Sequence, residues 1–242
     1  MSGHSKWHSI KHKKAAADAK RGKVFTKIIR EITVAAKIGG GDINANPRLR
    51  LIVQKAKEAN MPADNIDRAI KKGTGELEGV SYEELLYEGY GPEGVAFIMD
   101  ILTDNKNRTV AEIRKILSKH GGNLGESGSV GWMFEKKGVI MLSADKHSED
   151  EIMEIAIDAG ASDIATEDDM IVVYTSPEDF EAVKSVLLEK GKEIDSSEVS
   201  RIPNNTVPVS ADKSEKAVQL MELLEDHDDV QTLATNMELE ES

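Results

Sequence analysis

A cluster of basic residues surrounds Trp7 near the start of the chain. Its members are Lys6, Lys11, His12, Lys13 and Lys14. Lysine ammonium groups pair with phosphates and release the counterions condensed on them, and an indole ring offers a face on which a base can stack. These residue types predict a nucleic-acid contact in which the lysines bind phosphate, His12 binds phosphate or a base, and Trp7 stacks on a base or anchors the segment.

Positive charge continues into the segment that follows. Its basic residues are Lys20, Arg21, Lys23, Lys27 and Arg30. Apolar residues from Val24 to Ala36 recur at helical spacing, and the lysines lie largely off that stripe, so the pattern predicts a helix with one packed face and one charged face. We expect the lysines and Arg21 to contact phosphate, with Arg30, Arg48 and Arg50 as second-rank candidates.

The charge of the chain is strongly segregated. Residues 1–75 hold 12 Lys and 5 Arg against 6 acidic residues, a net charge of +11, whereas the whole chain carries −13 and the remainder therefore −24. Such a division usually reflects a partner, and a polyanion is the partner that a basic block selects. The alternative is a solvated basic arm that binds nothing.

Other chemistry finds little support. His4, His8 and His12 have the spacing of a helical metal site, but no acid or cysteine lies nearby and the flanking lysines would repel a cation. The chain contains no cysteine, which excludes disulfides and thiol-based sites. The glycines of residues 121–128 match no phosphate-loop pattern. We therefore predict no metal and no cofactor.

Catalytic constellations are also missing from the sequence pattern. The carboxylates form no recognisable acid/base pair, and the serines lack a nucleophile elbow. We predict that the protein is not an enzyme. Two alternatives stay open, a hydrolase that uses an interdomain cleft and a protein-interaction scaffold that uses an acidic domain.

Hydrophobic periodicity predicts an α+β fold with three domains. Residues 1–76 form a basic helical domain with three helices, and the glycines of residues 73–79 form a linker. Residues 132–204 have the order βαββαβ of a ferredoxin-like sandwich. Because the helix and strand of the C-terminal tail cannot bury a core alone, residues 80–131 and 205–242 are predicted to form one discontinuous α/β sandwich domain into which the ferredoxin-like domain is inserted.

The composition predicts a cytoplasmic protein without a membrane span. No apolar run approaches the ~20 residues that cross a bilayer, and the first residues lack the hydrophobic region of a secretion signal.

Several motifs, in order, resemble those of the YebC family. They include Gly3-His4-Ser5-Lys6-Trp7, Gly39-Gly40-Gly41-Asp42, Asn46-Pro47-Arg48-Leu49-Arg50, Tyr87-Glu88-Gly89-Tyr90-Gly91-Pro92, Asn107-Arg108-Thr109-Val110-Ala111 and Gly121-Gly122-Asn123-Leu124-Gly125. The resemblance implies three domains around a cleft and nucleic-acid association without known catalysis. Members are described as DNA-binding transcription regulators and, including a mitochondrial relative, as ribosome-linked translation factors. We predict a DNA-binding transcriptional regulator, with a translation factor bound to ribosomal RNA or the ribosome as the alternative.

Overall fold

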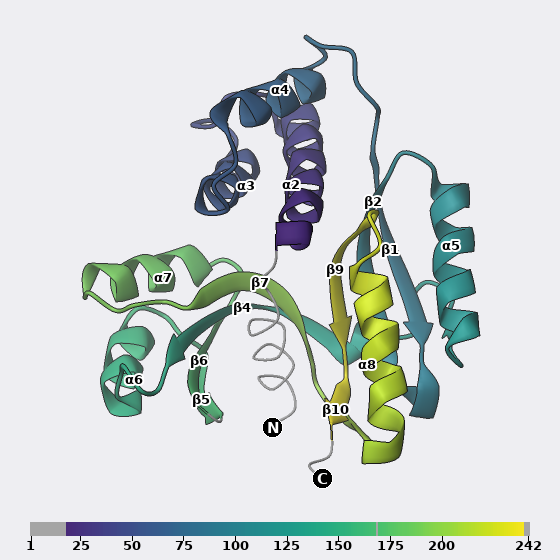
Figure 1. The fold of residues 1–242 in the computed structure, drawn as a ribbon. Coiled ribbons are helices and arrows are strands. Elements are labelled where there is room, and N and C mark those ends of the chain that lie inside the picture. The colour runs from purple at the N-terminus through teal and green to yellow at the C-terminus, as the bar shows by residue number, and fades with distance from the viewer. Residues whose placement is uncertain (1–17, 168, 240–242) are drawn as a thin grey trace.

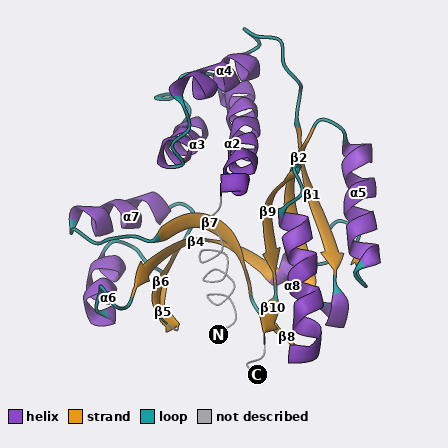
Figure 2. Cartoon of the chain, in the orientation of Figure 1, coloured by secondary structure: helices purple, strands orange, loops and turns teal. Residues whose placement is uncertain are grey.

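A helical unit lies above two antiparallel four-stranded sheets, each of which is covered by two helices (Figure 1, Figure 2). The computed structural model describes residues 18–167 and 169–239. The fold is thus mixed α+β. None of the described helices is long and apolar enough to cross a bilayer.

Three helices make up the upper unit: α2 (Asp18–Gly39), α3 (Pro47–Glu58) and α4 (Ala63–Thr74). Asn46 before Pro47 is the residue pattern of a helix start and predicts a cap at Asn46. Asn46 does cap α3: its side-chain oxygen accepts a 3.1 Å hydrogen bond from the Leu49 N–H, and Pro47 occupies the first turn. The core is aliphatic and includes Ile28, Ile32 and Leu49, all essentially inaccessible to solvent.

The first sheet has the strand order β3-β1-β2-β9. Its elements are β1 (Glu83–Tyr90), β2 (Ala96–Thr103), β3 (Asn123–Leu124) and β9 (Val230–Thr235), with the helices α5 (Lys106–Lys119) and α8 (Ala211–Glu225). Side chains alternate between the faces of a strand, so Phe97 and Met99 pack under α5 and α8 while Ala96 and Ile98 face Val130 on the other side.

The second sheet has the strand order β5-β6-β4-β7, with antiparallel pairs throughout. Its elements are β4 (Phe134–Ser143), α6 (Glu149–Asp158), β5 (Asp163–Glu167), β6 (Met170–Thr175), α7 (Phe180–Glu189) and β7 (Ser196–Pro203). This is the predicted βαββαβ order. Two short strands, β8 (Val207–Val209) and β10 (Met237–Leu239), pair in parallel, and single 3-10 turns lie at Pro92–Gly94 and Gly131–Met133.

Two sequence-based boundaries are wrong. Thr109 followed by Glu112 has the residue pattern of a capping box and predicts a helix that begins at Thr109, with Asn107 as a competing cap. Asn105 is the cap instead, and its side chain accepts a 3.1 Å hydrogen bond from the Arg108 N–H. The residues from Val230 to Leu239 predict one strand. They form two strands instead, because Asn236 interrupts the run and its side chain accepts a hydrogen bond from the Ala96 N–H at 2.7 Å. The division of the chain into three domains stays a prediction.

Candidate nucleic-acid interface

The basic face of α2 contacts the C-terminal end of α8. Lys27 Nζ donates to the Glu225 carbonyl at 2.8 Å, and Lys23 Nζ donates to the Asp226 carbonyl at 3.1 Å and lies 3.6 Å from the Asp226 carboxylate. The last carbonyls of a helix lack partners within the helix and form the negative end of its dipole. The two ammonium groups therefore stabilise the end of α8 and join the helical unit to the first sheet.

Arg30 extends this contact by one turn of α2. Its Nη1 donates to the carbonyls of Leu102 and Asp228, at 3.1 and 2.8 Å, and to Asp229 Oδ1 at 2.5 Å. The guanidinium also lies 5.4 Å from the centre of the Tyr82 ring, a cation–π distance. Only 14% of the Arg30 side chain is exposed. Arg30 therefore joins α2 of the helical unit to the first sheet's unit.

Asp229 bridges α2 and α5 through two arginines. Besides Arg30, its carboxylate accepts from Arg108 at 2.8 Å and from Thr109 Oγ1 at 2.6 Å, and its side chain is 2% exposed. Burial alone would raise the pKa of Asp229, but the hydrogen bonds from Thr109, Arg108 and Arg30 lower it to about 2. Asp229 is therefore a stable anion at neutral pH.

Glu112, His227 and Asp229 place ligand atoms within 4.8 Å of one another, as a metal site would. These side chains already form hydrogen bonds with one another and with neighbouring residues, however. His227 Nε2 lies 2.9 Å from Glu112, and the Asp229 N–H donates to His227 Nδ1 at 3.2 Å. A metal cation would also have to displace two guanidinium groups from Asp229. The arrangement is a hydrogen-bond network rather than a metal centre.

Arg48 and Arg50 lie at the start of α3. Arg48 forms a two-pronged ion pair with Glu84 of β1, and its hydrogen bond to that carboxylate raises the pKa of Arg48. Arg50 is exposed and donates to the Asn44 carbonyl at 3.1 Å. Other predicted contacts lie outside the described residues, namely Lys6, Trp7, Lys11, His12, Lys13 and Lys14, as do the side chains of Lys20 and Arg21.

The glycine-rich segment before the second sheet binds the buried carboxylate of Glu88, a residue of β1. Glu88 is buried, and it accepts hydrogen bonds from the N–H groups of Gly128, Val130 and Gly131 at 2.8, 2.6 and 2.7 Å. Burial raises the pKa of Glu88, but these three donors outweigh it and lower the pKa. The loop amides therefore serve packing, and they are not available to a phosphate.

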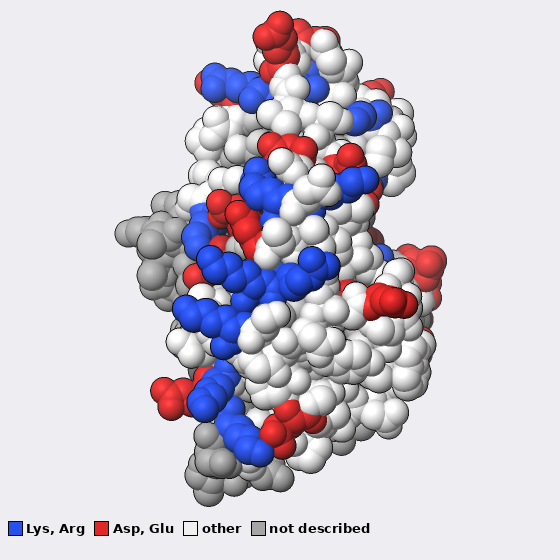
Figure 3. All heavy atoms as spheres, turned by 90° about the vertical axis from the view of Figure 1, so that its right-hand side faces the viewer, with Lys and Arg blue, Asp and Glu red and all other residues white. Residues whose placement is uncertain are grey.

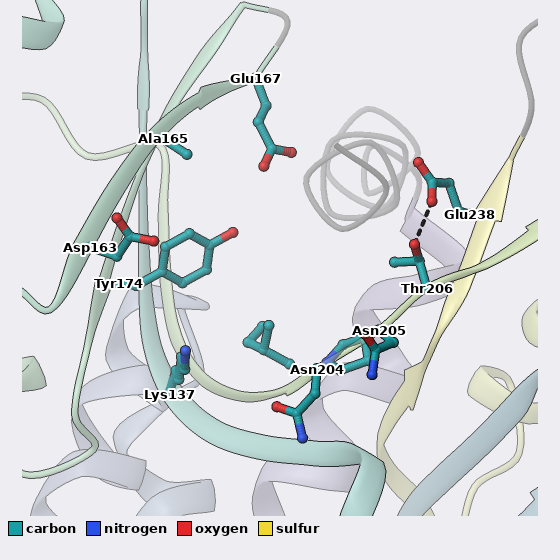
Figure 4. Close-up of a pocket in the computed structure, with 11 residues that line it drawn as sticks. Lys137, Asp163, Ala165, Glu167, Tyr174, Asn204, Asn205, Thr206 and Glu238 are labelled. Carbon is teal, nitrogen blue, oxygen red and sulfur yellow. Dashed lines mark hydrogen bonds between the residues drawn. The ribbon is translucent and has the colours of Figure 1, made fainter. Parts of the chain in front are cut away.

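A cleft of about 470 Å³ lies beside the second sheet (Figure 4). Asp163, Glu167 and Tyr174 line it from β5 and β6, and Glu238 lines it from β10, where it accepts a hydrogen bond from Thr206. Burial and the neighbouring carboxylates raise the pKa of Tyr174 to about 12. Three carboxylates against one lysine, Lys137, give the described lining a negative charge, which opposes phosphate binding.

Two family models match the chain. The model described as the TACO1/YebC protein N-terminal domain matches residues 5–76, and the model described as the TACO1/YebC second and third domain matches residues 82–237. The chain belongs to the TACO1/YebC family.

Relatives match over nearly their whole lengths. A "probable transcriptional regulatory protein" of Treponema denticola is 60% identical, covering 100% of this chain and 98% of that protein, and one of Persephonella marina is 57% identical, covering 99% and 96%. The crystal structure of a conserved hypothetical protein from Aquifex aeolicus has a TM-score of 0.85 and 47% identity, covering 96% of each chain. That structure shares the fold of this TACO1/YebC chain.

Two features of this TACO1/YebC chain were not predicted from its sequence. Asp229 lies in an acidic run, residues 225–229, where nothing in the residue types distinguishes it. The basic residues of α5 are masked in the overall charge balance because they lie in the acidic part of the chain. A local count would have found them, since Lys106–Lys119 holds five cations and one acid.

Proposed function

We propose that this chain is a cytoplasmic regulator of gene expression that binds nucleic acid through its basic N-terminal domain, residues 1–76, and performs no catalysis. The observation that carries the proposal is the segregation of charge, +11 on residues 1–75 against −24 on the remainder. The names of the relatives from Treponema denticola and Persephonella marina support a regulatory role. DNA is the leading polymer, and ribosomal RNA is the alternative.

The predicted contacts now fall into two ranks. The first holds Arg50, whose hydrogen bond is local, together with the predicted residues whose side chains lie outside the described part of the chain: Lys6, Trp7, Lys11, His12, Lys13, Lys14, Lys20 and Arg21. In the second rank, Lys23, Lys27, Arg30 and Arg48 would have to exchange an internal partner for a phosphate. Because no sequence-reading helix is identifiable, we expect recognition of the backbone and its shape more than of base edges.

Charge reversal at Lys13 and Lys14 tests the proposal. The slope of log K against log salt falls by about one for each lost phosphate contact, so Lys13→Glu/Lys14→Glu should bind labelled DNA or RNA more weakly and with a slope shallower by about two. Fluorescence anisotropy across a salt titration measures both. Lys146→Glu/Lys190→Glu changes the charge equally at exposed positions of the second sheet's unit. Equal effects of the two double variants would refute the assignment.

The polymer is identified in cell extract. Sedimentation through a sucrose gradient, with and without nuclease, separates the cases. Co-migration with ribosomes that nuclease abolishes favours ribosomal RNA. Absence from the ribosomal fractions, together with binding to particular promoter fragments, favours DNA.

A further inference from the structure

The outer face of α5 is the most basic surface in the described part of the first sheet's unit. Exposed cations on the helix are Lys106, Arg108, Arg114, Lys115 and Lys119. Glu112 is its single acid, and its carboxylate is engaged by His227 Nε2. Among the described residues no carboxylate pairs with Lys106, Arg114, Lys115 or Lys119, so their charges face solvent uncompensated.

Helical spacing aligns three of these cations. Arg108, Lys115 and Lys119 are separated by seven and four residues and lie on one side of α5, opposite the buried Ile113 and Leu117. At 1.5 Å per residue this row is roughly 16 Å long. This row of Arg108, Lys115 and Lys119 is called the α5 basic face below, and helical spacing places Lys106 and Arg114 on other sides of α5.

The helix dipole favours Lys119, which lies in the last turn of α5, but it does not explain the cations at the start of the helix. The first turn of α5 holds no acid and two cations, Lys106 and Arg108, although the positive end of the helix dipole favours acids there by about 0.3–1 kcal/mol each. Arg108 has structural partners in Asp229 and Asp104, at 2.8 and 2.9 Å. Lys106 has none among the described residues, and it adds positive charge where the helix N-terminus already attracts anions.

The α5 basic face continues the basic surface of the helical unit. Figure 3 looks at the side on which α5 lies and shows Lys and Arg side chains following one another down this face from the helical unit. Asp229 binds Arg30 of α2 and Arg108 of α5 simultaneously. The two basic elements are therefore held in a fixed relation.

We propose that the α5 basic face is a second contact surface for the phosphate backbone of a nucleic-acid duplex whose first contact is the N-terminal domain. This rests on the proposed function and extends it to a part of the chain with a net negative charge. A duplex suits a long, fixed row of cations because it is stiff over about 150 base pairs and presents phosphates at regular intervals.

A protein partner explains the surface less well. Protein interfaces centre on buried aromatic and apolar anchors, and no large hydrophobic side chain of α5 is exposed. Phosphate recognition needs only the cations. Binding of an acidic protein is thus the competing outcome, and it would leave duplex affinity untouched.

The test is the double variant Lys115→Gln/Lys119→Gln in the full chain. Anisotropy with a short labelled DNA duplex and an RNA duplex of the same length is measured across a salt series. We expect about tenfold weaker binding near 0.1 M salt and a log–log slope shallower by about two, for whichever duplex binds. The control Lys146→Gln/Lys190→Gln removes the same charge elsewhere, and thermal unfolding confirms that each variant folds.

The outcomes separate this inference from the proposed function. If the Lys13/Lys14 variant weakens binding while the α5 variant matches the Lys146/Lys190 control, the α5 basic face is not a contact and the proposed function stands. If the unaltered protein binds neither duplex, both proposals fall. An α5 variant that binds as tightly as the unaltered protein but loses an acidic protein partner also overturns the inference.

Discussion

At the scale of single residues, Asp229 is the clearest case of a charge whose burial is compensated. Removing a carboxylate from water is costly unless it is paired and hydrogen-bonded. Two arginines and two threonines, Thr103 and Thr109, meet this need. The acid thereby joins three chain segments that are far apart in sequence.

Replacing Asp229 by Asn should destabilise the protein by about 3 kcal/mol, because the largely buried Arg30 guanidinium loses its counter-ion and Arg108 keeps only Asp104. Urea unfolding at neutral pH measures the loss. The neighbouring Asp228→Asn, at an exposed side chain, should change stability by less than about 0.5 kcal/mol. A similar, small effect of both substitutions would show that the bridge contributes little.

The same carboxylate predicts a pH dependence. The pKa of Asp229 is about 2 in the folded protein, below its ordinary value of 3.8. The contribution of its ionised form to the free energy of unfolding is therefore complete above about pH 4 and is lost as the pH falls towards 2. This contribution is about 2 kcal/mol. The difference in unfolding free energy between the unaltered protein and Asp229→Asn should narrow by that amount between about pH 5 and pH 2. A constant difference would contradict the assignment.

At the scale of elements, α2 and α4 approach closely because Gly73 lacks a side chain. A Cβ at Gly73 would lie 2.4 Å from the Thr33 carbonyl oxygen and 2.7 Å from Ala36 Cβ. Helix propensity favours alanine over glycine by about 0.5–1 kcal/mol, but steric overlap in a packed contact costs about 1–3 kcal/mol. The close contact between α2 and α4, rather than helix propensity, therefore requires glycine at position 73.

The pair Gly73→Ala and Gly22→Ala isolates this contact. Both glycines are helical, but a Cβ at Gly22 meets nothing within 4 Å. Gly22→Ala should raise the unfolding free energy by about 0.5–1 kcal/mol, and Gly73→Ala should lower it by about 1–2 kcal/mol. Chemical denaturation of both variants decides the matter, and a gain in both would mean that α4 can move away from α2.

Local patterns predicted most elements and few of their contacts. The Asn46-Pro47 pair predicted the start of α3 because the cap is a local hydrogen bond. The start of α5 was ambiguous, since Asn105, Asn107 and Thr109 are all capping residue types and tertiary bonding of Thr109 to Asp229 decides between them. Periodicity likewise predicted the basic face of α2. It could not predict that this face meets α8, which lies about two hundred residues away in sequence.

At the scale of the whole molecule, some cations form internal contacts that hold the helical unit against the first sheet, and others are exposed on the surface. Part of the N-terminal domain's positive charge is used internally, where α2 meets the end of α8. The exposed cations include those of α4 in the helical unit and those of the α5 basic face in the first sheet's unit. The internal contacts therefore fix the position of the exposed cations of one unit relative to those of the other. The affinity for a duplex bound along both sets of exposed cations would depend on the relative placement of the helical unit and the first sheet.

That placement should loosen when Arg30 is replaced. Arg30→Met keeps the length and apolar stem of the side chain but removes its hydrogen bonds to Leu102, Asp228 and Asp229. Because the chain has no cysteine, Lys57→Cys and Ser118→Cys provide a unique pair of spin-label positions, both exposed, on α3 and α5. Double electron–electron resonance should give one narrow distance distribution for the doubly labelled protein and a broader one after Arg30→Met.

The matched control is Arg50→Met, which removes an exposed arginine of the same unit whose hydrogen bond is local. It should leave the distance distribution unchanged, and circular dichroism should show equal helix content in both variants. If Arg30→Met leaves the distribution narrow, apolar packing and the lysine contacts to α8 are sufficient to fix the helical unit. The bridge through Asp229 would then stabilise the fold without setting the geometry of the basic surface.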